Sequence, residues 1–152
     1  TPVSFALLLN LVAVANPEDK SQLWGFISQY APDASPEKNL LLDELAGYAM
    51  SYYQDFVLPQ KTYRAPTDKE RAAMEDLSAR LKAFDGEPTS ENLQTLTFSV
   101  GKEHEFENLR EWFQALYEVL LGQSQGPRFG SFAALYGVAN TARLMDEALA
   151  RD

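Results

Sequence analysis

The amino-acid sequence predicts an all-α protein, a bundle of several helices. Apolar residues recur every three or four positions along most of the chain, which is the spacing of an amphipathic helix. The segments that carry this period begin at capping residues and end at glycine or proline. Hydrophobic residues make up 45% of the 152 residues, enough to bury the core of a domain. We therefore expect residues 1–152 to form a single helical domain.

The N-terminal apolar run, residues 3–15, predicts a central, buried helix. The run is apolar except at Ser4 and Asn10. It resembles the apolar part of a signal peptide, but no basic residue precedes it. It is also much shorter than the ~20 residues that cross a bilayer. We therefore expect no membrane segment here.

Two further helices are predicted in the first part of the chain. Asn16 is placed as the N-cap of the second helix and Pro17 as its first residue, and this helix ends near Tyr30. Ser35 is placed as the cap of the third and longest helix, residues 36–57. The apolar residues of this helix recur at three- and four-residue spacing: Leu41, Leu45, Tyr48, Ala49, Tyr52, Tyr53 and Phe56.

The fourth and fifth helices each begin at a threonine. Thr67 and Glu70 have the spacing of a capping box, which starts a helix that ends near Phe84. Its inward-facing residues are predicted to be Ala73, Leu77, Leu81 and Phe84. Thr89 or Ser90 caps the fifth helix, and Gly101 is expected to end it. Because β-branched residues crowd its later turns, a short strand there is the alternative.

The last three helices include a tight polar corner. Asn108 caps the sixth helix, which ends at Gly122, in the position typical of a C-terminal helix glycine. After a Gln-Ser-Gln-Gly-Pro-Arg turn, the helical period restarts at Phe129. Gly130 is predicted to allow a close approach of another backbone. A final amphipathic helix covers residues 138–150.

Charge is unevenly distributed along this acidic chain. The net charge is −9, which by itself argues against binding to nucleic acid. However, residues 56–67 and 119–145 contain four basic residues and no acidic residue, so all 22 acidic residues lie elsewhere, with nine basic ones. Because charges are screened beyond about 8 Å at physiological salt, a local basic surface can still attract an anionic ligand.

Side chains in these two acid-free segments are suited to binding single-stranded RNA. Bases in RNA loops are recognised by stacking on aromatic rings or guanidinium groups and by hydrogen bonds to their edges. Turns hold such side chains toward solvent. The candidate RNA-binding residues are Lys61, Tyr63 and Arg64 in the first segment and Gln123, Gln125, Arg128 and Phe129 in the second.

Each of these residues also has an alternative, structural interpretation. The segment from Pro59 to Pro66 is typical of a proline-bounded linker with solvated charges. Phe129, like Phe132, has the helical spacing of a core residue. Arg128 is the only charged residue of its corner, but it could equally pair with a nearby carboxylate or cap a helix end.

The sequence contains no recognisable catalytic or metal-binding motif. It lacks a glycine-rich phosphate loop, the zinc-protease pattern HExxH and a nucleophile elbow. The chain has no cysteine, consistent with a reducing cytoplasm, and its single histidine, His104, lies among glutamates that are typical of a solvated face. We expect neither a catalytic residue nor a metal or cofactor site in this chain.

Three segments resemble the C-terminal part of class I lysyl-tRNA synthetases. They are FALLLNLVAVAN, YYQDFVLPQKTYRAPT and, most specifically, GQSQGPRFGSFAALYG. The resemblance implies an α-helix cage, similar to the anticodon-binding domain of glutamyl-tRNA synthetases, that binds the anticodon loop of lysine tRNA. It also implies a catalytic domain upstream, which would use ATP. The two ATP-binding motifs of that family do not occur in these 152 residues, and the chain opens without Met. We therefore interpret it as a fragment of a longer protein. The resemblance implies that this protein is cytoplasmic.

A helical protein-interaction module without RNA binding is the rival interpretation. In this case the apolar helix at residues 3–15 or the aromatic corner near Phe129 would bind a protein partner. The sequence preceding Thr1 would distinguish the two, because an ATP-binding domain there would favour the synthetase.

Overall fold

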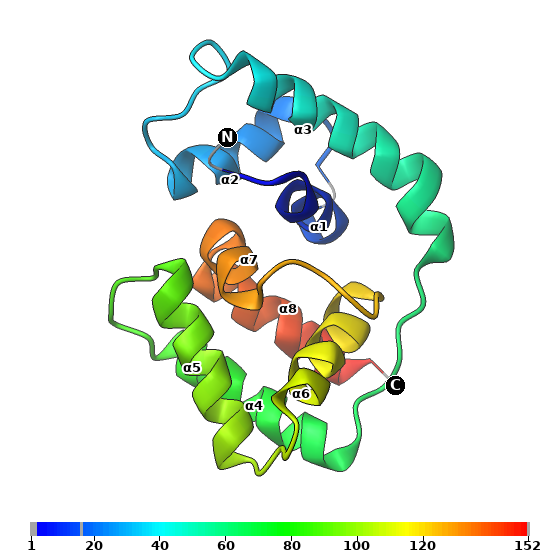
Figure 1. Ribbon diagram of the computed structural model, residues 1–152, viewed down its shortest axis with the longest axis vertical. Coiled ribbons are helices and arrows are strands. Elements are labelled where there is room, and N and C mark those ends of the chain that lie inside the picture. Colours follow the sequence, from blue (N-terminus) through cyan, green and yellow to red (C-terminus); the bar gives the residue numbers. More distant parts are fainter. Residues whose placement is uncertain (1–2, 16, 152) are drawn as a thin grey trace. The chain divides into compact units, whose positions relative to one another are not determined.

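The computed structural model describes residues 3–15 and 17–151, and these residues form helices joined by turns (Figure 1). No strand occurs in this part of the chain, so the all-α prediction is confirmed. The chain forms two compact units, one within residues 1–61 and the other within residues 62–152. A single functional domain over residues 1–152 stays a prediction.

The first unit contains α1 (Phe5–Ala15), α2 (Lys20–Tyr30), α3 (Leu40–Tyr52), the π-helical turn η1 (Tyr53–Val57) and the 3-10 turn η2 (Leu58–Gln60). The second unit contains α4 (Asp68–Lys82), α5 (Ser90–Glu103), α6 (Leu109–Leu116), the π-helical turn η3 (Tyr117–Leu121), α7 (Phe129–Tyr136) and α8 (Val138–Ala150).

The N-terminal run forms the buried helix that its composition predicts. α1 packs against α3, and Leu8 and Leu11 are fully buried. The Asn10 side chain is also buried, and its amide donates a 2.8 Å hydrogen bond to the Ala6 carbonyl oxygen. α1 has only 11 residues, and no helix in the described residues is both long enough and apolar enough to span a bilayer.

The beginnings of the second and third helices differ from the predictions. The prediction for Asn16 lies outside the described residues, and α2 is capped by Asp19, whose carboxylate accepts hydrogen bonds from the Ser21 and Gln22 backbone. The prediction that Ser35 caps a helix from residue 36 is wrong. Ser35 and Asn39 instead bond to each other across a separate turn, and α3 begins after it.

The apolar residues of α3 and η1 divide between two faces. Their buried residues are Leu42, Ala46, Ala49 and Tyr53, which pack within the first unit. In contrast, Leu41, Tyr48 and Phe56 are 62%, 60% and 58% exposed, although they share the predicted apolar period. The helix is therefore apolar over more of its circumference than this unit buries.

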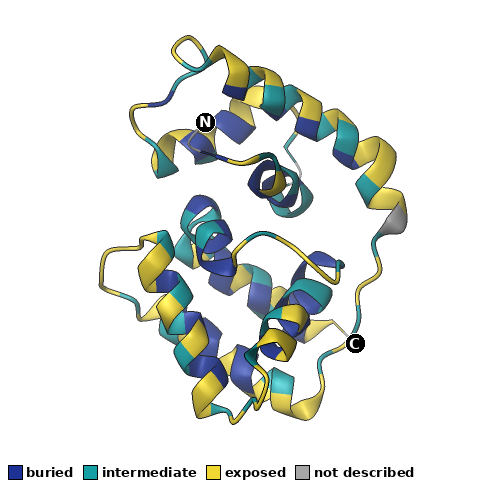
Figure 2. Cartoon of the chain, viewed as in Figure 1, coloured by how far each residue is buried: buried dark blue, intermediate teal, exposed yellow. Residues whose placement is uncertain are grey.

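In the second unit, α4 packs against α8 and α5 packs against α7. Buried residues follow the inner sides of these helices, and exposed residues follow the outer sides (Figure 2). Ala73, Leu77 and Leu81 of α4 are buried as predicted, whereas Phe84 lies beyond the helix and is half-buried. The capping box is confirmed, because Thr67 and Glu70 exchange both hydrogen bonds.

The fifth helix is continuous, and the strand alternative is wrong. Thr97 is buried in α5, where its hydroxyl donates a 2.8 Å hydrogen bond to the Leu93 carbonyl oxygen. Gly101 does not end the helix. A Cβ atom at Gly101 would lie 2.5 Å from the Trp112 ring, so glycine is present to admit that ring. Packing against α6, rather than helix termination, explains this glycine.

Gly130 allows α7 to approach α5 closely, as the sequence predicts. A Cβ atom at Gly130 would lie 2.3 Å from the Ser90 carbonyl oxygen and 2.6 Å from the Gln94 nitrogen. The approach is stabilised by two hydrogen bonds. The Gly130 N–H donates to Gln94 Oε1 at 2.7 Å, and the hydroxyl groups of Ser90 and Ser131 lie 2.6 Å apart.

We predict that Gly130→Ala lowers the free energy of unfolding by at least ~1–3 kcal/mol, because backbone atoms of α5 cannot move away as a flexible side chain can. Urea denaturation followed by circular dichroism measures this change. Gly25→Ala in α2 is the matched control. It is expected to be neutral or stabilising, because, apart from adjacent residues and the backbone of α2 itself, no described atom lies within 4 Å of the added methyl group. Equal effects of both substitutions would contradict the packing argument.

Candidate nucleic-acid interface

The polar corner begins where the helix formed by α6 and η3 ends at Gly122. Gly122 has a φ of 69° in the left-handed region, which confirms the predicted C-terminal glycine. Its N–H donates to the Tyr117 carbonyl oxygen. The chain then passes through residues 123–127 and reaches Arg128, the N-cap residue of α7.

The two acid-free segments meet at this glycine. The Thr62 N–H donates a 3.1 Å hydrogen bond to the Gly122 carbonyl oxygen. The Tyr63 ring lies against Gly122, since a Cβ atom there would be 3.1 Å from the ring. Segments separated by about 60 positions in the sequence are therefore adjacent in the second unit.

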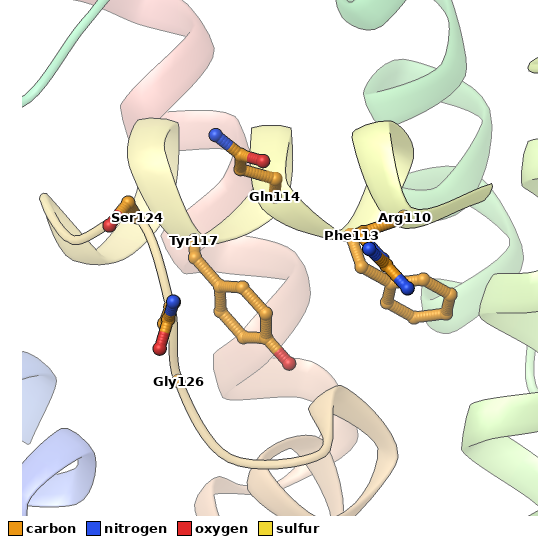
Figure 3. Close-up of a pocket in the computed structure, with 7 residues that line it drawn as sticks. Arg110, Phe113, Gln114, Tyr117, Ser124 and Gly126 are labelled. Carbon is orange, nitrogen blue, oxygen red and sulfur yellow. The ribbon is translucent and has the colours of Figure 1, made fainter. Parts of the chain in front are cut away.

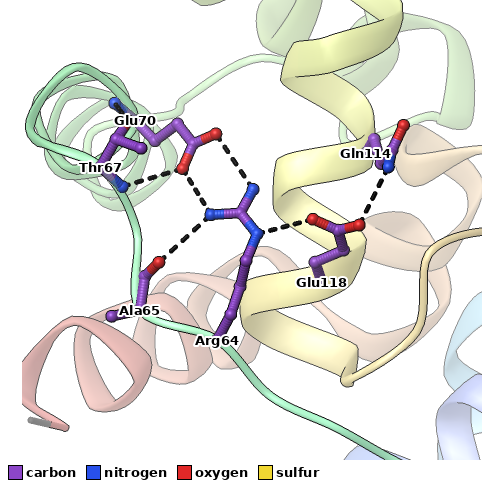
Figure 4. A network of polar contacts seen from close by, with 6 residues as sticks. All are labelled: Arg64, Ala65, Thr67, Glu70, Gln114 and Glu118. Carbon is purple, nitrogen blue, oxygen red and sulfur yellow. Dashed lines mark hydrogen bonds and ion pairs between the residues drawn. The ribbon is translucent and has the colours of Figure 1, made fainter.

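Arg64 fastens the first segment to two other elements (Figure 4). Its Nε donates to Glu118 Oε1 of η3 at 2.6 Å. Its two terminal nitrogens donate to the Glu70 carboxylate of α4 at 2.7 and 3.0 Å, and one of them also donates to the Ala65 carbonyl oxygen at 3.2 Å. The planar guanidinium group of Arg64 therefore donates four hydrogen bonds.

The bonds of Arg64 to Glu70 and Glu118, here called the Arg64 clamp, are reflected in the pKa values of these two carboxyl groups. Burial tends to raise the pKa of Glu70, but hydrogen bonds from Arg64 and the Thr67 backbone outweigh burial and lower it. Hydrogen bonds from Gln114 and then Arg64 lower the pKa of Glu118. Arg64 therefore acts inside the unit, and a phosphate would have to compete with two carboxylates to bind it.

Tyr63 is 44% exposed and has a cationic neighbour that the sequence interpretation did not include. The Arg151 guanidinium carbon lies 4.6 Å from the Tyr63 ring centroid. Arg151 also donates a 2.5 Å hydrogen bond to the carbonyl oxygen of Val119 in η3. Because an arginine near the end of a helix is common, the sequence gives no sign of this contact. It is the fold that brings Arg151 to Tyr63.

The candidate residues of the second acid-free segment differ in how far they are exposed to solvent. Gln125 and Arg128 are exposed, and Gln123 is half-buried. No carboxylate of residues 3–15 and 17–151 lies within 4.0 Å of the Arg128 guanidinium. The suggestion that Arg128 pairs with a carboxylate therefore finds no partner in that part of the chain. Lys61, at the end of the first unit, lies over the Tyr53 ring at 5.2 Å.

Phe129 does not present its ring to solvent. Its side chain is 1% exposed and packs beside Phe132, with ring centroids 6.0 Å apart. The prediction that Phe129 stacks on an RNA base therefore does not agree with its position. The helical period that places Phe129 and Phe132 on one face of α7 turns both rings into the core.

A surface pocket of about 520 Å³ adjoins the corner (Figure 3). α6 and η3 form one side of it and the loop after Gly122 forms the other. It is lined by Arg110, Phe113, Gln114, Tyr117, Ser124, Gln125 and Gly126. Of these, only Gln125 is among the predicted site residues. Phe113 and Tyr117 share the apolar period of the helix, which does not distinguish a pocket wall from the core.

Tyr117 fixes the loop against the helix. Its hydroxyl donates a hydrogen bond to the Pro127 carbonyl oxygen. A Cβ atom at Gly126 would lie 3.0 Å from the Tyr117 ring, so glycine lets the loop pack directly on the ring. Burial raises the pKa of the Tyr117 hydroxyl, which therefore stays protonated and can donate at neutral pH.

The histidine and the acids near it contact one another and an arginine rather than form an open site. His104 Nε2 lies 2.9 Å from Asp76 Oδ2, and Arg80 bridges Asp76 and Glu103. Among the described residues no group of three histidine, cysteine or acidic side chains is arranged to hold a metal ion.

Comparison with known proteins identifies relatives over almost the whole chain. No protein-family profile matches. A lysine–tRNA ligase of Roseobacter denitrificans is 57% identical over 148 residues, 97% of this chain. Lysine–tRNA ligases of Rickettsia bellii and Rickettsia felis are 46% and 44% identical over 97% and 95% of the chain. The chain is homologous to a segment of lysine–tRNA ligases. It spans 28%, 28% and 27% of the length of these three relatives.

We predict that Arg64→Met lowers the free energy of unfolding by roughly 1 kcal/mol at pH 7, because Arg64 is partly exposed and its ion pairs are screened. The folded-state pKa values of Glu70 and Glu118 are lowered. Their pairing with Arg64 therefore stabilises the fold fully above the unfolded glutamate pKa of about 4.3, and this stabilisation is lost as the pH falls below it.

Urea denaturation of both proteins between pH 7 and pH 3 should show the difference in stability shrinking at low pH. Arg143→Met is the matched control, because the exposed Arg143 side chain bonds to the neutral Asn140. A difference between Arg64→Met and the native protein that does not change with pH would show that Arg64 acts through packing alone.

Proposed function

We propose that the chain is the C-terminal anticodon-binding part of a class I lysine–tRNA ligase and that the Gly122 corner contacts the anticodon loop of lysine tRNA. The observation that carries this proposal is the meeting of the two acid-free segments at Gly122, where Tyr63 packs. Gln125 and Arg128 follow in the next few residues of the chain and are exposed. Its homology to lysine–tRNA ligases supports the choice of tRNA.

The remainder of the ligase then binds ATP and lysine and charges the tRNA in the cytoplasm. The present chain supplies recognition and needs no cofactor of its own. Such a division suits a segment that covers 28% of its relatives and carries no catalytic motif. The upstream catalytic domain of the same polypeptide is therefore its second partner.

Arg128 is the residue best placed to read a base. It is exposed, and its position between Pro127 and the first turn of α7 restricts its backbone. A guanidinium group held in this way loses little entropy on binding. It can stack on an unstacked base and donate hydrogen bonds to a uridine carbonyl.

The rival function is a protein-interaction module that would bind its partner through α1 or the aromatic corner near Phe129. The burial of these two regions gives it less support. Leu7, Leu8 and Leu11 of α1 are buried, and so are Phe129 and Phe132 at the corner. These five side chains are therefore not available to a protein partner.

We predict that Arg128→Ala weakens binding of the lysine tRNA anticodon stem-loop by ~1–3 kcal/mol and reduces the preference for it over a stem-loop with an exchanged anticodon, because Arg128 contacts a base. Fluorescence anisotropy with both RNAs measures this. Arg143→Ala removes one exposed positive charge elsewhere and should leave the preference unchanged. Loss of stability without loss of preference in Arg128→Ala would make Arg128 a structural residue.

We further predict that Lys61→Ala weakens binding of both stem-loops about equally, as loss of a phosphate contact does. The dependence of log Kd on log salt concentration should also become shallower by about 0.7, the contribution of one phosphate on single-stranded RNA. A salt titration of the native chain and the variant tests this. An unchanged slope would show that Lys61 does not contact phosphate.

A further inference from the structure

We infer that the pocket between α6 and the loop after Gly122 holds one unstacked base of a single-stranded RNA loop. This inference rests on the proposed function and adds the ligand of a specific site. The pocket has a volume of about 520 Å³ and opens on the surface beside the corner (Figure 3). It is a different place from Arg128, which does not line it.

Aromatic side chains in the pocket are suited to the flat face of a base. Phe113 and Tyr117 lie one helical turn apart on the same side of the α6–η3 helix, and both are half-buried. Figure 3 shows both rings projecting from the same side of this helix. Bases in RNA loops commonly stack on such rings, whichever base is present.

Amide groups in the pocket are suited to the edge of a base. Gln114 of the helix and Gln125 of the loop both line the pocket, and each amide carries both donors and an acceptor. Gln114 donates one 2.9 Å hydrogen bond to Glu118 Oε2, which fixes its orientation. The edges of bases also combine donors and acceptors, so neutral amides can complement them without adding charge.

The charge of the pocket favours a neutral group attached to phosphate. Among the described residues, Arg110 is the only charged one that lines it. One exposed arginine suits the phosphate that precedes or follows a base, whereas the absence of a carboxylate from the lining disfavours a basic peptide. The ligand class is therefore a nucleobase within an RNA strand.

The pocket is held in shape before any ligand binds. The Tyr117 hydroxyl bonds to Pro127, and Gly126 packs on the other part of the same ring. The loop that carries Gln125 is thereby fixed, which reduces the entropy lost on binding.

The pocket is tested by combining a substitution in the protein with removal of single bases from the RNA. The lysine tRNA anticodon stem-loop is prepared with an abasic site at each loop position in turn, and Kd is measured for the native chain and for Phe113→Leu. For the native chain, removal of the base that occupies the pocket should weaken binding about 5-fold to about 100-fold, as expected for one lost stack. In Phe113→Leu the loss at that position should shrink to about twofold or less, with losses at other positions unchanged.

Phe98→Leu is the matched control, because Phe98 is a 39% exposed aromatic residue of α5 outside the pocket. It should behave as the native chain does. Gln125→Met, in an exposed loop position, is a second variant that leaves the core intact and should reduce the loss at the same abasic position. Thermal midpoints verify that all variants are folded.

The outcomes separate the pocket from the proposed function. Suppose that Arg128→Ala weakens binding, but that each abasic site increases Kd by the same factor for Phe113→Leu, for Gln125→Met and for the native chain. The pocket then holds no base, and only this inference is overturned. If the native chain does not bind the stem-loop, the proposed function fails and the inference fails with it.

Discussion

The ion pairs of Arg64 with Glu70 and Glu118 are the interaction on which the arrangement of the corner depends. They join the segment that enters the second unit to the start of α4 and to η3. The Glu70 carboxylate also completes the capping box with Thr67, so one side chain both starts a helix and holds the clamp. Because the clamp lies beside the bond between Thr62 and Gly122, it fixes where Tyr63 can lie.

This clamp changes how the charge of the chain should be interpreted. Counting basic residues along the sequence gives Arg64 and Arg128 equal weight, but Arg64 is neutralised by two carboxylates and Arg128 has none within 4.0 Å among the described residues. The fold also places Arg110 in the pocket that adjoins the corner and Arg151 against Tyr63. A protein with a net charge of −9 can thus present a local set of cations, since salt screens its more distant acidic residues.

The second unit depends equally on glycines that allow close packing. Gly122 provides the left-handed end of a helix against which Tyr63 packs, and Gly130 allows α7 to contact the α5 backbone. Gly126 lets the loop lie on Tyr117. The corner is therefore built mainly from backbone approach, and this approach holds Gln125 and Arg128 in place while their side chains stay exposed.

The sequence by itself determined the fold class, the Thr67–Glu70 capping box and the glycine end at Gly122, because these depend on residues within one or two helical turns. Only the tertiary structure decided the partners of Arg64, since one of them, Glu118, is 54 positions away. It also decided which apolar residues are core. Helical spacing is the same for a buried face, for the exposed residues of α3 and for a pocket wall, and the difference depends on what packs against them.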